Sequence, residues 1–360
     1  MDPLTQGALG AALPQSVADR KRLGIAMLCG FAGGMAPDLD VLIRSSEDPL
    51  LFLEYHRQFT HSLIFIPIGG LLVAAALWLV VGRKRQWPFR DLLLFSTLGY
   101  ATHALLDACT TYGTQLLWPF TDARFAWNNV SIIDPLLTLP LVSLMIASRW
   151  RRSPGLARLG VCWVVIYLLL GVFARDMAET AGAALAASRG HHSAVVSAKP
   201  SFANLLVWKT IYRADGRFYI DAIRIGTEPK TYVGESVPTL NLQRDLPWLR
   251  PDSKHALDIE RFRWFSMDHL ALDPEDPLRV IDVRYSMLPN EIRPLWGIAL
   301  EPAGQDQHVR YVTTRDGADK SLSALWQMML GERSNSTHIA LENDQASSSA
   351  VKTSTSAAHP

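Results

Sequence analysis

The chain has 360 residues, with 35 Lys and Arg against 34 Asp and Glu, and therefore a formal net charge of +1. This balance excludes a protein that holds nucleic acid chiefly through bulk positive charge, and three cysteines are too few for a disulfide scaffold. The charge is unevenly distributed, because residues 1–175 carry 26 charged side chains and the remaining residues carry 43. We therefore expect two unlike halves.

The first half contains five apolar segments, each close to the roughly 20 residues that cross a membrane as a helix. Two of them have no charged residue, and three carry isolated acids within apolar sequence. Five such segments in succession would leave a soluble core without a polar surface, so we predict an α-helical integral membrane domain with about five spans. The segments are residues 23–43, 62–82, 92–111, 132–148 and 159–174.

Basic residues between these segments predict their orientation. The loops before the first span, after the second, and between the fourth and fifth hold eleven Lys and Arg, whereas the two alternate loops hold three. Short cytoplasmic loops of membrane proteins are enriched in Lys and Arg. The N-terminus is therefore predicted to be cytoplasmic, and the chain after Arg175 periplasmic. No cleavable signal peptide is expected, because the first residues lack a basic region before an apolar one.

Acidic side chains collect at the predicted periplasmic ends of the spans. Asp38 and Asp40 lie near the outer end of the first span, where Pro37 and the preceding glycines predict a helix that breaks. Asp134 opens the fourth span from the same side. Ionisable groups inside a membrane are costly, so their presence there indicates a functional role.

Histidines gather at the same ends. His56 and His61 lie in the loop before the second span, and His103 and Asp107 lie four residues apart on one face of the third. Taken singly, each group is also explained by a helix cap, a hydrogen-bonded pair or interfacial water. Because all of these acids and histidines lie at the same predicted side of the membrane, a single site that contains them is favoured. Carboxylates and neutral imidazoles are ligands of zinc, manganese and iron, so we predict a divalent metal ion, with zinc first.

The order of motifs in this half resembles the YdjM-type inner-membrane family, whose members are described as membrane-bound metal-dependent hydrolases. The match covers about residues 1–150 and is most specific in its PDxD and HRxxTHS blocks. It also suggests a distant relation to zinc-dependent phospholipase C enzymes. The motifs are MDPLT at residues 1–5, PDLD at 37–40, HRQFTHS at 56–62, His103 with Asp107, LWPF at 117–120 and IIDP at 132–135.

The resemblance implies a multi-pass protein of the bacterial inner membrane with metal-dependent hydrolase activity. Family members commonly have histidine after the DPLT motif, where this chain has Gln6. A glutamine oxygen is a weak metal ligand, so the site is expected to be one ligand short or to hold a different number of ions. Three of the implied positions, Asp38, Asp40 and Asp107, are candidates for the catalytic base. The implied metal positions are Asp38, Asp40, His56, His61, His103 and Asp107.

The leading hypothesis is a hydrolase in which a metal-activated water attacks a lipid-like or membrane-associated phosphoester or ester at the periplasmic face. The alternative is a non-enzymatic membrane protein, either a proton or metal transporter or a protein with a degenerate, structural metal site. A transport path needs polar residues on both sides of the bilayer midplane, and the inner ends of the spans have almost none. In a third hypothesis the outer domain carries the function and the spans only anchor it to the membrane. The expected partners are the bilayer and a lipid substrate, and no nucleic acid.

The second half reads as an α+β, mostly β, extramembrane domain. Residues 178–193 are rich in alanine and predict a helical continuation followed by a linker, in which His191 and His192 are expected to be solvated. From residue 204 the apolar period is two, and Asp215-Gly216 predicts a hairpin turn. The basic and aromatic run at 261–265 favours a half-buried strand over a site for single-stranded nucleic acid. Further strands are predicted at 280–287, 295–300 and 309–313, and a helix at 321–330.

These patterns divide the chain into four parts. We predict a transmembrane domain over residues 1–176, a linker over 177–200 and a β-rich extracytoplasmic domain over 201–331. Residues 332–360 are rich in Ser, Thr and Ala without periodicity, and predict a disordered tail.

Overall fold

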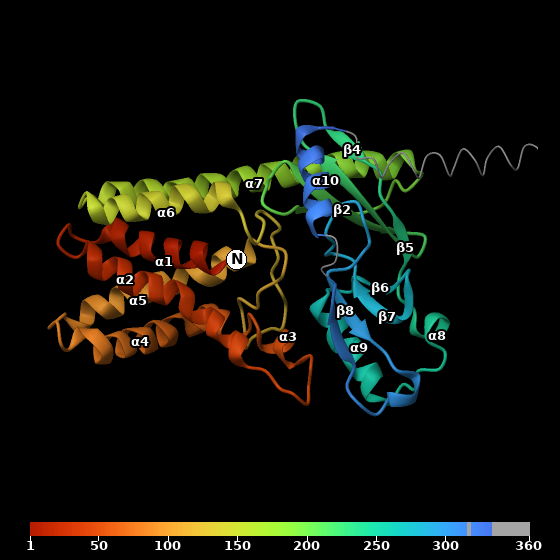
Figure 1. Ribbon diagram of the computed structural model, residues 1–360, viewed down its shortest axis with the longest axis horizontal. Helices are drawn as coiled ribbons and strands as arrows, with labels where there is room; N and C mark the ends of the chain where they lie inside the picture. Colours follow the sequence, from red (N-terminus) through yellow and green to blue (C-terminus); the bar gives the residue numbers. More distant parts are fainter. Residues whose placement is uncertain (315–317, 333–360) are drawn as a thin grey trace, which may run out of the picture.

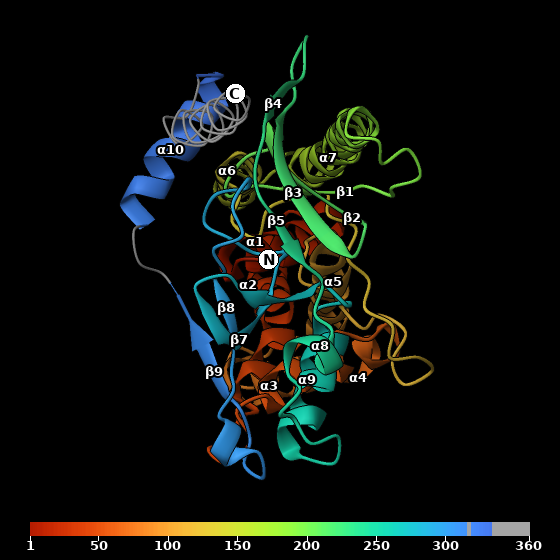
Figure 2. The same ribbon diagram turned by 90° about the vertical axis from the view of Figure 1, so that its right-hand side faces the viewer.

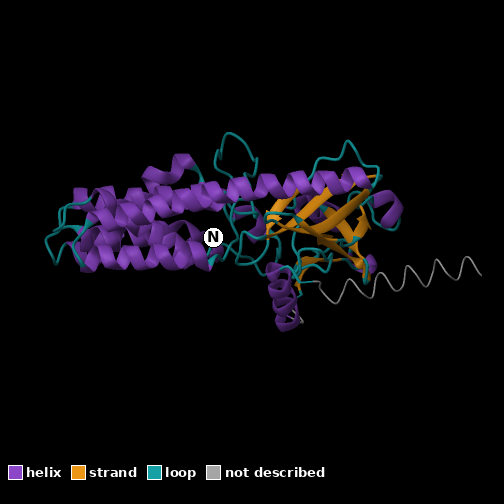
Figure 3. Ribbon diagram, turned by 90° about the horizontal axis from the view of Figure 1, so that it is seen from above, coloured by secondary structure: helices purple, strands orange, loops and turns teal. Residues whose placement is uncertain are grey.

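The computed structural model describes residues 1–314 and 318–332, which form a helical bundle followed by a β-rich domain (Figure 1). The longest helix, α7, belongs to both parts: its first half packs in the bundle and its second half lies along the strands (Figure 3). The predicted order of a helical half and a mostly β half is therefore confirmed. The bundle helices are α1 Pro3–Val17, α2 Leu23–Met35, α4 Ile66–Leu77, α5 Phe89–Ala108, α6 Pro135–Trp150 and α7 Pro154–Ser188.

Three helical segments have the length and apolar composition of membrane spans: Leu23–Leu42, Leu63–Gly82 and Pro154–Ser188. The predicted count of five spans is not confirmed. Helix α6 is apolar but has only 16 residues. Helix α5 has 20 residues, but charged and polar side chains such as those of Asp91 and Asp107 lower its hydropathy.

Helix α1 has no counterpart among the predicted segments. It is packed against α2, α5, α6 and α7 and is buried over most of its length. The Asp2 carboxylate accepts a hydrogen bond from the Thr5 amide at 3.0 Å, and Pro3 occupies the first helical position, which together define the start of the helix. Most residues of this helix are buried, on every face, so its sequence shows no amphipathic period.

Glycines allow α1, α2 and α5 to approach one another closely. A Cβ atom on Gly30 of α2 would lie 2.2 Å from the carbonyl oxygen of Gly10 in α1. A Cβ atom on Gly99 of α5 would lie 2.3 Å from the carbonyl oxygen of Gly30. Such contacts between small residues are typical of helices packed in membranes. They place the end of α2, which leads into the segment that carries Asp38 and Asp40, beside α5.

Irregular segments connect the bundle helices at the end that faces the β-rich domain. Helix α2 passes at Ala36 into a 3₁₀ helix, with Pro37 at its start, so the predicted break is confirmed. The 3₁₀ geometry turns Asp38 and Asp40 away from the α-helical path. The segments are the 3₁₀ helix Ala36–Leu42, α3 Leu51–Tyr55, the 3₁₀ turns Phe59–His61 and Leu63–Phe65, and a π-helical turn Trp78–Gly82 after α4.

The second domain contains two antiparallel sheets, with strand orders β1-β2-β3-β4 (β5 also pairs with β3) and β6-β7-β8-β9 (Figure 2). The predicted hairpin is confirmed as β2 Val207–Ala214 and β3 Arg217–Arg224, joined through two residues with positive φ. The other strands are β1 Ser197–Pro200, β4 Lys230–Tyr232, β5 Ser236–Pro238, β6 Leu270–Asp273, β7 Asp276–Asp282, β8 Trp296–Ala299 and β9 Arg310–Thr313. The helical segments are α8 Leu242–Asp245, α9 Lys254–Phe265, a 3₁₀ turn Pro302–Gly304 and α10 Ala318–Leu330.

One predicted strand is wrong. The run at 261–265 forms the last turns of α9, where Phe262 and Phe265 are buried and Arg261 and Arg263 form ion pairs. Aromatic residues three apart share a helix face, and five residues are too few to show which period governs them. The strands predicted at 280–287, 295–300 and 309–313 overlap β7, β8 and β9, and the predicted helix lies within α10. The predicted tail after residue 332 lies outside the described residues.

The β-rich domain docks on the segment that follows the first span. Leu50 and Leu53, the latter in α3, are buried in one apolar cluster with residues of α9. The Arg261 guanidinium of α9 donates to the carboxylates of Asp48 and Glu54. The domain therefore covers the end of the bundle that carries the acids and histidines.

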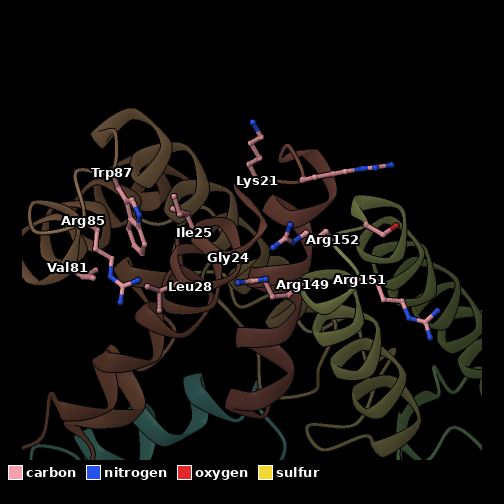
Figure 4. Close-up of a pocket in the computed structure, with 12 residues that line it drawn as sticks. Lys21, Gly24, Ile25, Leu28, Val81, Arg85, Trp87, Arg149, Arg151 and Arg152 are labelled. Carbon is pink, nitrogen blue, oxygen red and sulfur yellow. The ribbon is translucent and has the colours of Figure 1, made fainter.

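The opposite end of the bundle is basic. A cavity of about 1000 Å³ lies there between α2, the end of α4 and the α6–α7 turn. Figure 4 shows the guanidinium groups of Arg85, Arg149 and Arg152 around this cavity, with Leu28 and Trp87 in its wall. The cationic residues that line it are Arg20, Lys21, Arg85, Arg149, Arg151 and Arg152.

Candidate metal centre

Four side chains from three segments bring one ligand atom each to a common point: Asp38 from the 3₁₀ helix, His61 from the turn Phe59–His61, and His103 with Asp107 from α5. Their atoms lie within 4.8 Å of one another. The Nε2 atoms of His61 and His103 are 2.9 Å apart. Asp38 Oδ1 lies 3.5 and 3.3 Å from these two nitrogens, and Asp107 Oδ2 lies 3.2 and 3.5 Å from them.

These separations fit a tetrahedral ion. Zinc binds imidazole nitrogen and carboxylate oxygen at about 2.0–2.2 Å, so the ligand atoms of a tetrahedral site are about 3.3–3.5 Å apart. The five separations given above run from 2.9 to 3.5 Å, and all four atoms lie within 4.8 Å of one another. The donor set of two imidazoles and two carboxylates is one that zinc, manganese and iron accept.

Hydrogen bonds on the far side of each ring orient the two histidines. His103 Nδ1 lies 2.6 Å from the carbonyl oxygen of Gly34, which can only accept, so this nitrogen carries the proton. His61 Nδ1 lies 3.2 Å from Asp40 Oδ2 and donates to it in the same way. Both Nε2 atoms then present lone pairs toward the centre. Two lone pairs at 2.9 Å repel each other unless a proton or a cation lies between them.

Asp40 and His56 stand beside this cluster. Asp40 Oδ1 lies 2.7 Å from His56 Nδ1, and Asp40 Oδ2 accepts from the Arg57 amide and the Thr60 hydroxyl, both at 2.9 Å. Burial lowers the pKa of His56, which favours its neutral form. Asp38, Asp40 and His56 form a second group of potential ligand atoms within 4.8 Å, so Asp38 is common to both groups.

Residues that sequence reasoning did not assign surround Asp107. Arg57 Nε lies 3.0 Å from Asp107 Oδ2, and the amino group of Met1 donates to Asp107 Oδ1. Gln6 Nε2 donates to the same Oδ1 at 2.9 Å, so the residue that departs from the family pattern lies within the centre. Arg57 belongs to the HRxxTHS block, which could have indicated its role, whereas no sequence signal indicated Met1.

Charge and hydrogen bonding also fit a cation. Three carboxylates, of Asp38, Asp40 and Asp107, lie at the centre, and the guanidinium of Arg57 and the amino group of Met1 both contact Asp107. Among the described residues, Asp107 Oδ2 has no hydrogen-bond donor of good geometry although it is fully buried. A buried carboxylate oxygen without a donor is costly, and a bound ion would satisfy it.

The centre is accessible at one corner. The Asp38 side chain is 23% exposed, whereas those of His61, His103 and Asp107 are completely buried. Asp134 lies apart from the centre, where it caps α6 and accepts hydrogen bonds from Tyr167 at 2.8 and 2.9 Å. A solvent-side approach to the four ligand atoms is therefore open at Asp38.

A bundle with three helical segments long and apolar enough to span a membrane is typical of an integral membrane protein, and the His/Asp cluster at one end of the bundle is a candidate metal centre. The chain belongs to the YdjM inner membrane protein family, whose sequence model matches residues 1–178. The inner membrane protein YbcI of Escherichia coli (strain K12) is 32% identical over 148 residues, which are 38% of this chain and 82% of that protein. YfhP of Bacillus subtilis (strain 168) is 25% identical over 173 residues.

The match to YfhP covers 46% of this chain and 52% of that protein, so the chain spans about half the length of this relative. No solved structure matches the chain. The family match ends at residue 178, within α7, and so contains every residue of the candidate metal centre.

Proposed function

We propose that the protein is a membrane-bound metal-dependent hydrolase that acts on a phosphoester or ester of a lipid or another membrane-associated molecule. The observation that carries the proposal is the cluster of four ligand atoms, which lie within 4.8 Å of one another and include the two imidazole nitrogens 2.9 Å apart. Zinc is the ion that this geometry suits best. A divalent ion held there supplies Lewis acidity and lowers the pKa of a bound water.

Catalytic zinc sites use three protein ligands and keep one position open. His61, His103 and Asp107 are the three fully buried members, and we assign them as ligands. Asp38 is the accessible member, and its Oδ1 lies 3.3–3.5 Å from both imidazole nitrogens. Its carboxylate is therefore placed to accept the proton of the attacking water as general base.

Asp40 and His56 support this arrangement in the proposal. Asp40 holds the Nδ1 proton of His61, a carboxylate–histidine contact that fixes the ring and raises its basicity as a ligand. The Nδ1 atom of His56 lies 2.7 Å from the other carboxylate oxygen of Asp40, Oδ1. With Asp38 they supply donors for a second ion, and this is the place where a two-metal site would form.

The proposed reaction takes place at the periplasmic face. The basic cavity lies at the end of the bundle opposite the metal centre, as expected if that end is cytoplasmic. An impermeant maleimide tests this orientation on Lys84→Cys and Glu275→Cys. We expect labelling of position 275 in intact spheroplasts and of position 84 only after lysis; the reverse pattern would overturn the orientation.

Metal analysis of detergent-purified protein tests the centre. We expect about one equivalent of zinc in the wild type, loss of the metal in His103→Ala and Asp107→Ala, and retention in His191→Ala, whose side chain instead contacts Tyr212 and Asp215. Hydrolysis is measured as release of water-soluble phosphate compounds from radiolabelled inner-membrane lipids. Asp38→Asn should keep the metal and lose turnover. Metal-free wild-type protein after zinc supplementation would refute the proposal.

A structural metal site is the second candidate, because four protein ligands at the corners of a tetrahedron are typical of closed zinc sites. An ion there would join the first span, α5 and the segment between them. Under this candidate, Asp38→Asn loses metal as His103→Ala does, and chelation lowers the Tm of a wild type that has no turnover. The Asp38→Asn result separates the two candidates.

A further inference from the structure

A second cluster of ionisable side chains lies where the β-rich domain meets the bundle. It surrounds a cavity of about 150 Å³, which is lined by Thr111 and Ser131 from the bundle and by Lys199, Lys209 and Arg284 from the β-rich domain. No Asp or Glu of the described chain lines this cavity. The space is several times what one water needs, about 15 Å³, and accommodates an ion of a few heavy atoms.

The two lysines are forced together by the sheet. Lys199 of β1 pairs directly with Lys209 of β2 in the antiparallel register, so both side chains lie on the same face. Their exposed fractions are only 6% and 4%, and that of Arg284 is 2%. Like charges directly opposite in a sheet are destabilising, and burial increases their repulsion.

The hydrogen bonds of this cluster are incomplete. Lys209 Nζ donates to Ser286 Oγ at 2.7 Å and to the Glu291 carbonyl oxygen at 3.0 Å. Arg284 directs Nε and Nη2 to the Asp282 carboxylate, which leaves Nη1 buried and without an acceptor among the described residues. Lys199 lines the same cavity as Lys209 and Arg284.

The cluster carries an excess of positive charge. Within the described residues, Asp282 is the one carboxylate that forms an ion pair with any of the three cations, and neither lysine has a carboxylate in direct contact. Glu179 accepts from the Ala198 amide, and Glu235 and Glu291 line a different cavity. Burial lowers the pKa of both Lys199 and Lys209 to about 7. A dianion in the cavity would offset the excess charge and accept the free N–H groups.

We propose that this cavity binds a small tetrahedral dianion, either inorganic phosphate or the phosphate of a small phosphomonoester, between Lys199, Lys209 and Arg284. Hydroxyl groups of Thr111, Ser131 and Ser201 complete the lining around it. Because the walls come from both parts of the chain, the bound anion joins the β-rich domain to the bundle. The site is independent of the proposed hydrolase activity.

A chain of packed side chains connects this cavity with the metal centre. Arg284 lies over the ring of Phe265, which packs edge-on against Tyr112 at 5.1 Å between centroids. The Arg57 guanidinium lies over the same tyrosine ring at 4.8 Å and contacts Asp107. Anion binding therefore stabilises the packing that also supports the metal centre.

The test uses full-length protein in detergent after treatment with a chelator, so that phosphate cannot bind through a metal ion. Thermal unfolding is compared in phosphate and in chloride at equal ionic strength, and binding is measured by equilibrium dialysis with radiolabelled phosphate. We expect phosphate to raise the Tm by several degrees and to saturate one site. Lys199→Met should weaken binding at least tenfold. The matched surface variant Lys254→Met should bind as the wild type does.

Two further measurements test where phosphate binds and which ligand the site prefers. Arg149→Gln, in the basic cavity at the other end of the bundle, should leave phosphate binding unchanged. Displacement of phosphate by glycerol 3-phosphate would assign a phosphomonoester, and its failure would assign the free ion. Wild-type protein without saturable binding, or an undiminished response in a folded Lys199→Met variant, would overturn the proposal. Equilibrium dialysis of the wild-type protein tests for saturable phosphate binding even if the lysine variants fail to fold.

Discussion

Asp40 Oδ2 lies 3.2 Å from His61 Nδ1, on the side of the imidazole ring that faces away from the four ligand atoms. The same oxygen accepts from the Thr60 hydroxyl and the Arg57 amide, and the other oxygen contacts His56. With both oxygens engaged, Asp40 acts in the proposed centre by orienting His61, which is a positioning role.

Asp40→Asn should therefore weaken metal binding without abolishing it. Loss of a carboxylate behind a ligating histidine typically lowers metal affinity about 10–100-fold. Competition with a chromogenic chelator measures this change, and Asp48→Asn, an acid of the same connecting segment that binds Arg261, is the control. A loss as complete as that of His103→Ala would show instead that Asp40 is itself a ligand.

Arg57→Gln should destabilise the metal-free protein more than the metal-loaded one. Arg57 is the only side-chain cation in contact with Asp107 among the described residues, and both groups are buried. Removing one partner of a buried ion pair costs about 3–5 kcal/mol when the other charge is left uncompensated, and the contact of the Met1 amino group with Asp107 reduces this cost in part. A bound divalent ion would supply that compensation. Unfolding with and without chelator measures the difference.

The exposed Arg44→Gln is the control for this substitution, since among the described residues the Arg44 side chain bonds only the carbonyl oxygen of Val41. Equal destabilisation of Arg57→Gln with and without metal would indicate that Asp107 does not contact the ion.

Gly30→Ala should disturb both the fold and the metal centre. The added Cβ would lie 2.2 Å from the Gly10 carbonyl oxygen, so α2 must move away from α1. Overpacking of this kind costs about 1–3 kcal/mol. Because α2 leads directly into Asp38, metal affinity should fall together with the Tm. Gly155→Ala is the control, since its Cβ would meet nothing closer than 3.6 Å; an intact metal site in Gly30→Ala would contradict the prediction.

The residues of the candidate centre could be proposed from the sequence because their signals are local. The spacing of His103 and Asp107 places them on one helix face, and Pro37 predicts the break that redirects Asp38. The placement of Lys and Arg in the loops then predicted that these groups lie at one end of the bundle. The contacts of Arg57 and Met1 with Asp107 join residues 50 and 106 positions apart, and no local period reports such a contact.

The parts of the fold that the sequence did not predict also depend on packing that a local sequence pattern does not report. Helix α1 is enclosed by four helices and needs no polar face, so it has no helical period to detect. The run at 261–265 alternates basic and aromatic residues as a strand would, but α9 buries Phe262 and Phe265 from one face. The prediction that α5 spans the membrane is not confirmed, because its charged residues lower its hydropathy.

Gln6→His should increase the metal-binding capacity of the centre. Gln6 Nε2 lies 2.9 Å from Asp107 Oδ1, and its Oε1 has no hydrogen-bond partner among the described residues. An imidazole at this position would present a nitrogen lone pair beside the carboxylate, as the family pattern implies. We expect tighter binding or a second equivalent of metal. Gln15→His, the same change at another buried position of α1, should leave the metal content unchanged.

Stability of the β-rich domain should increase as the pH rises from 7 to 9 in phosphate-free buffer. Burial, with Arg284 acting on Lys199, lowers the pKa of Lys199 and Lys209 from 10.5 to about 7, while Asp282 opposes the shift. Between these values the unfolded chain binds more protons than the folded one, so raising the pH favours folding. Each such group contributes up to about 1.4 kcal/mol per pH unit.

Nearby glutamates also oppose the lowering of the lysine pKa values: Glu179 acts on Lys199, and Glu235 and Glu291 act on Lys209. The expected gain in stability per pH unit is therefore below about 1.4 kcal/mol for each lysine. Thermal unfolding of chelator-treated protein at pH 7 and pH 9 measures the gain. Lys199→Met should reduce the dependence on pH, because one of the two titrating groups is gone, and Lys254→Met should preserve it. Phosphate should reduce it as well, since a bound dianion keeps both lysines protonated. A wild-type Tm that does not rise with pH would show that both lysines keep their ordinary pKa.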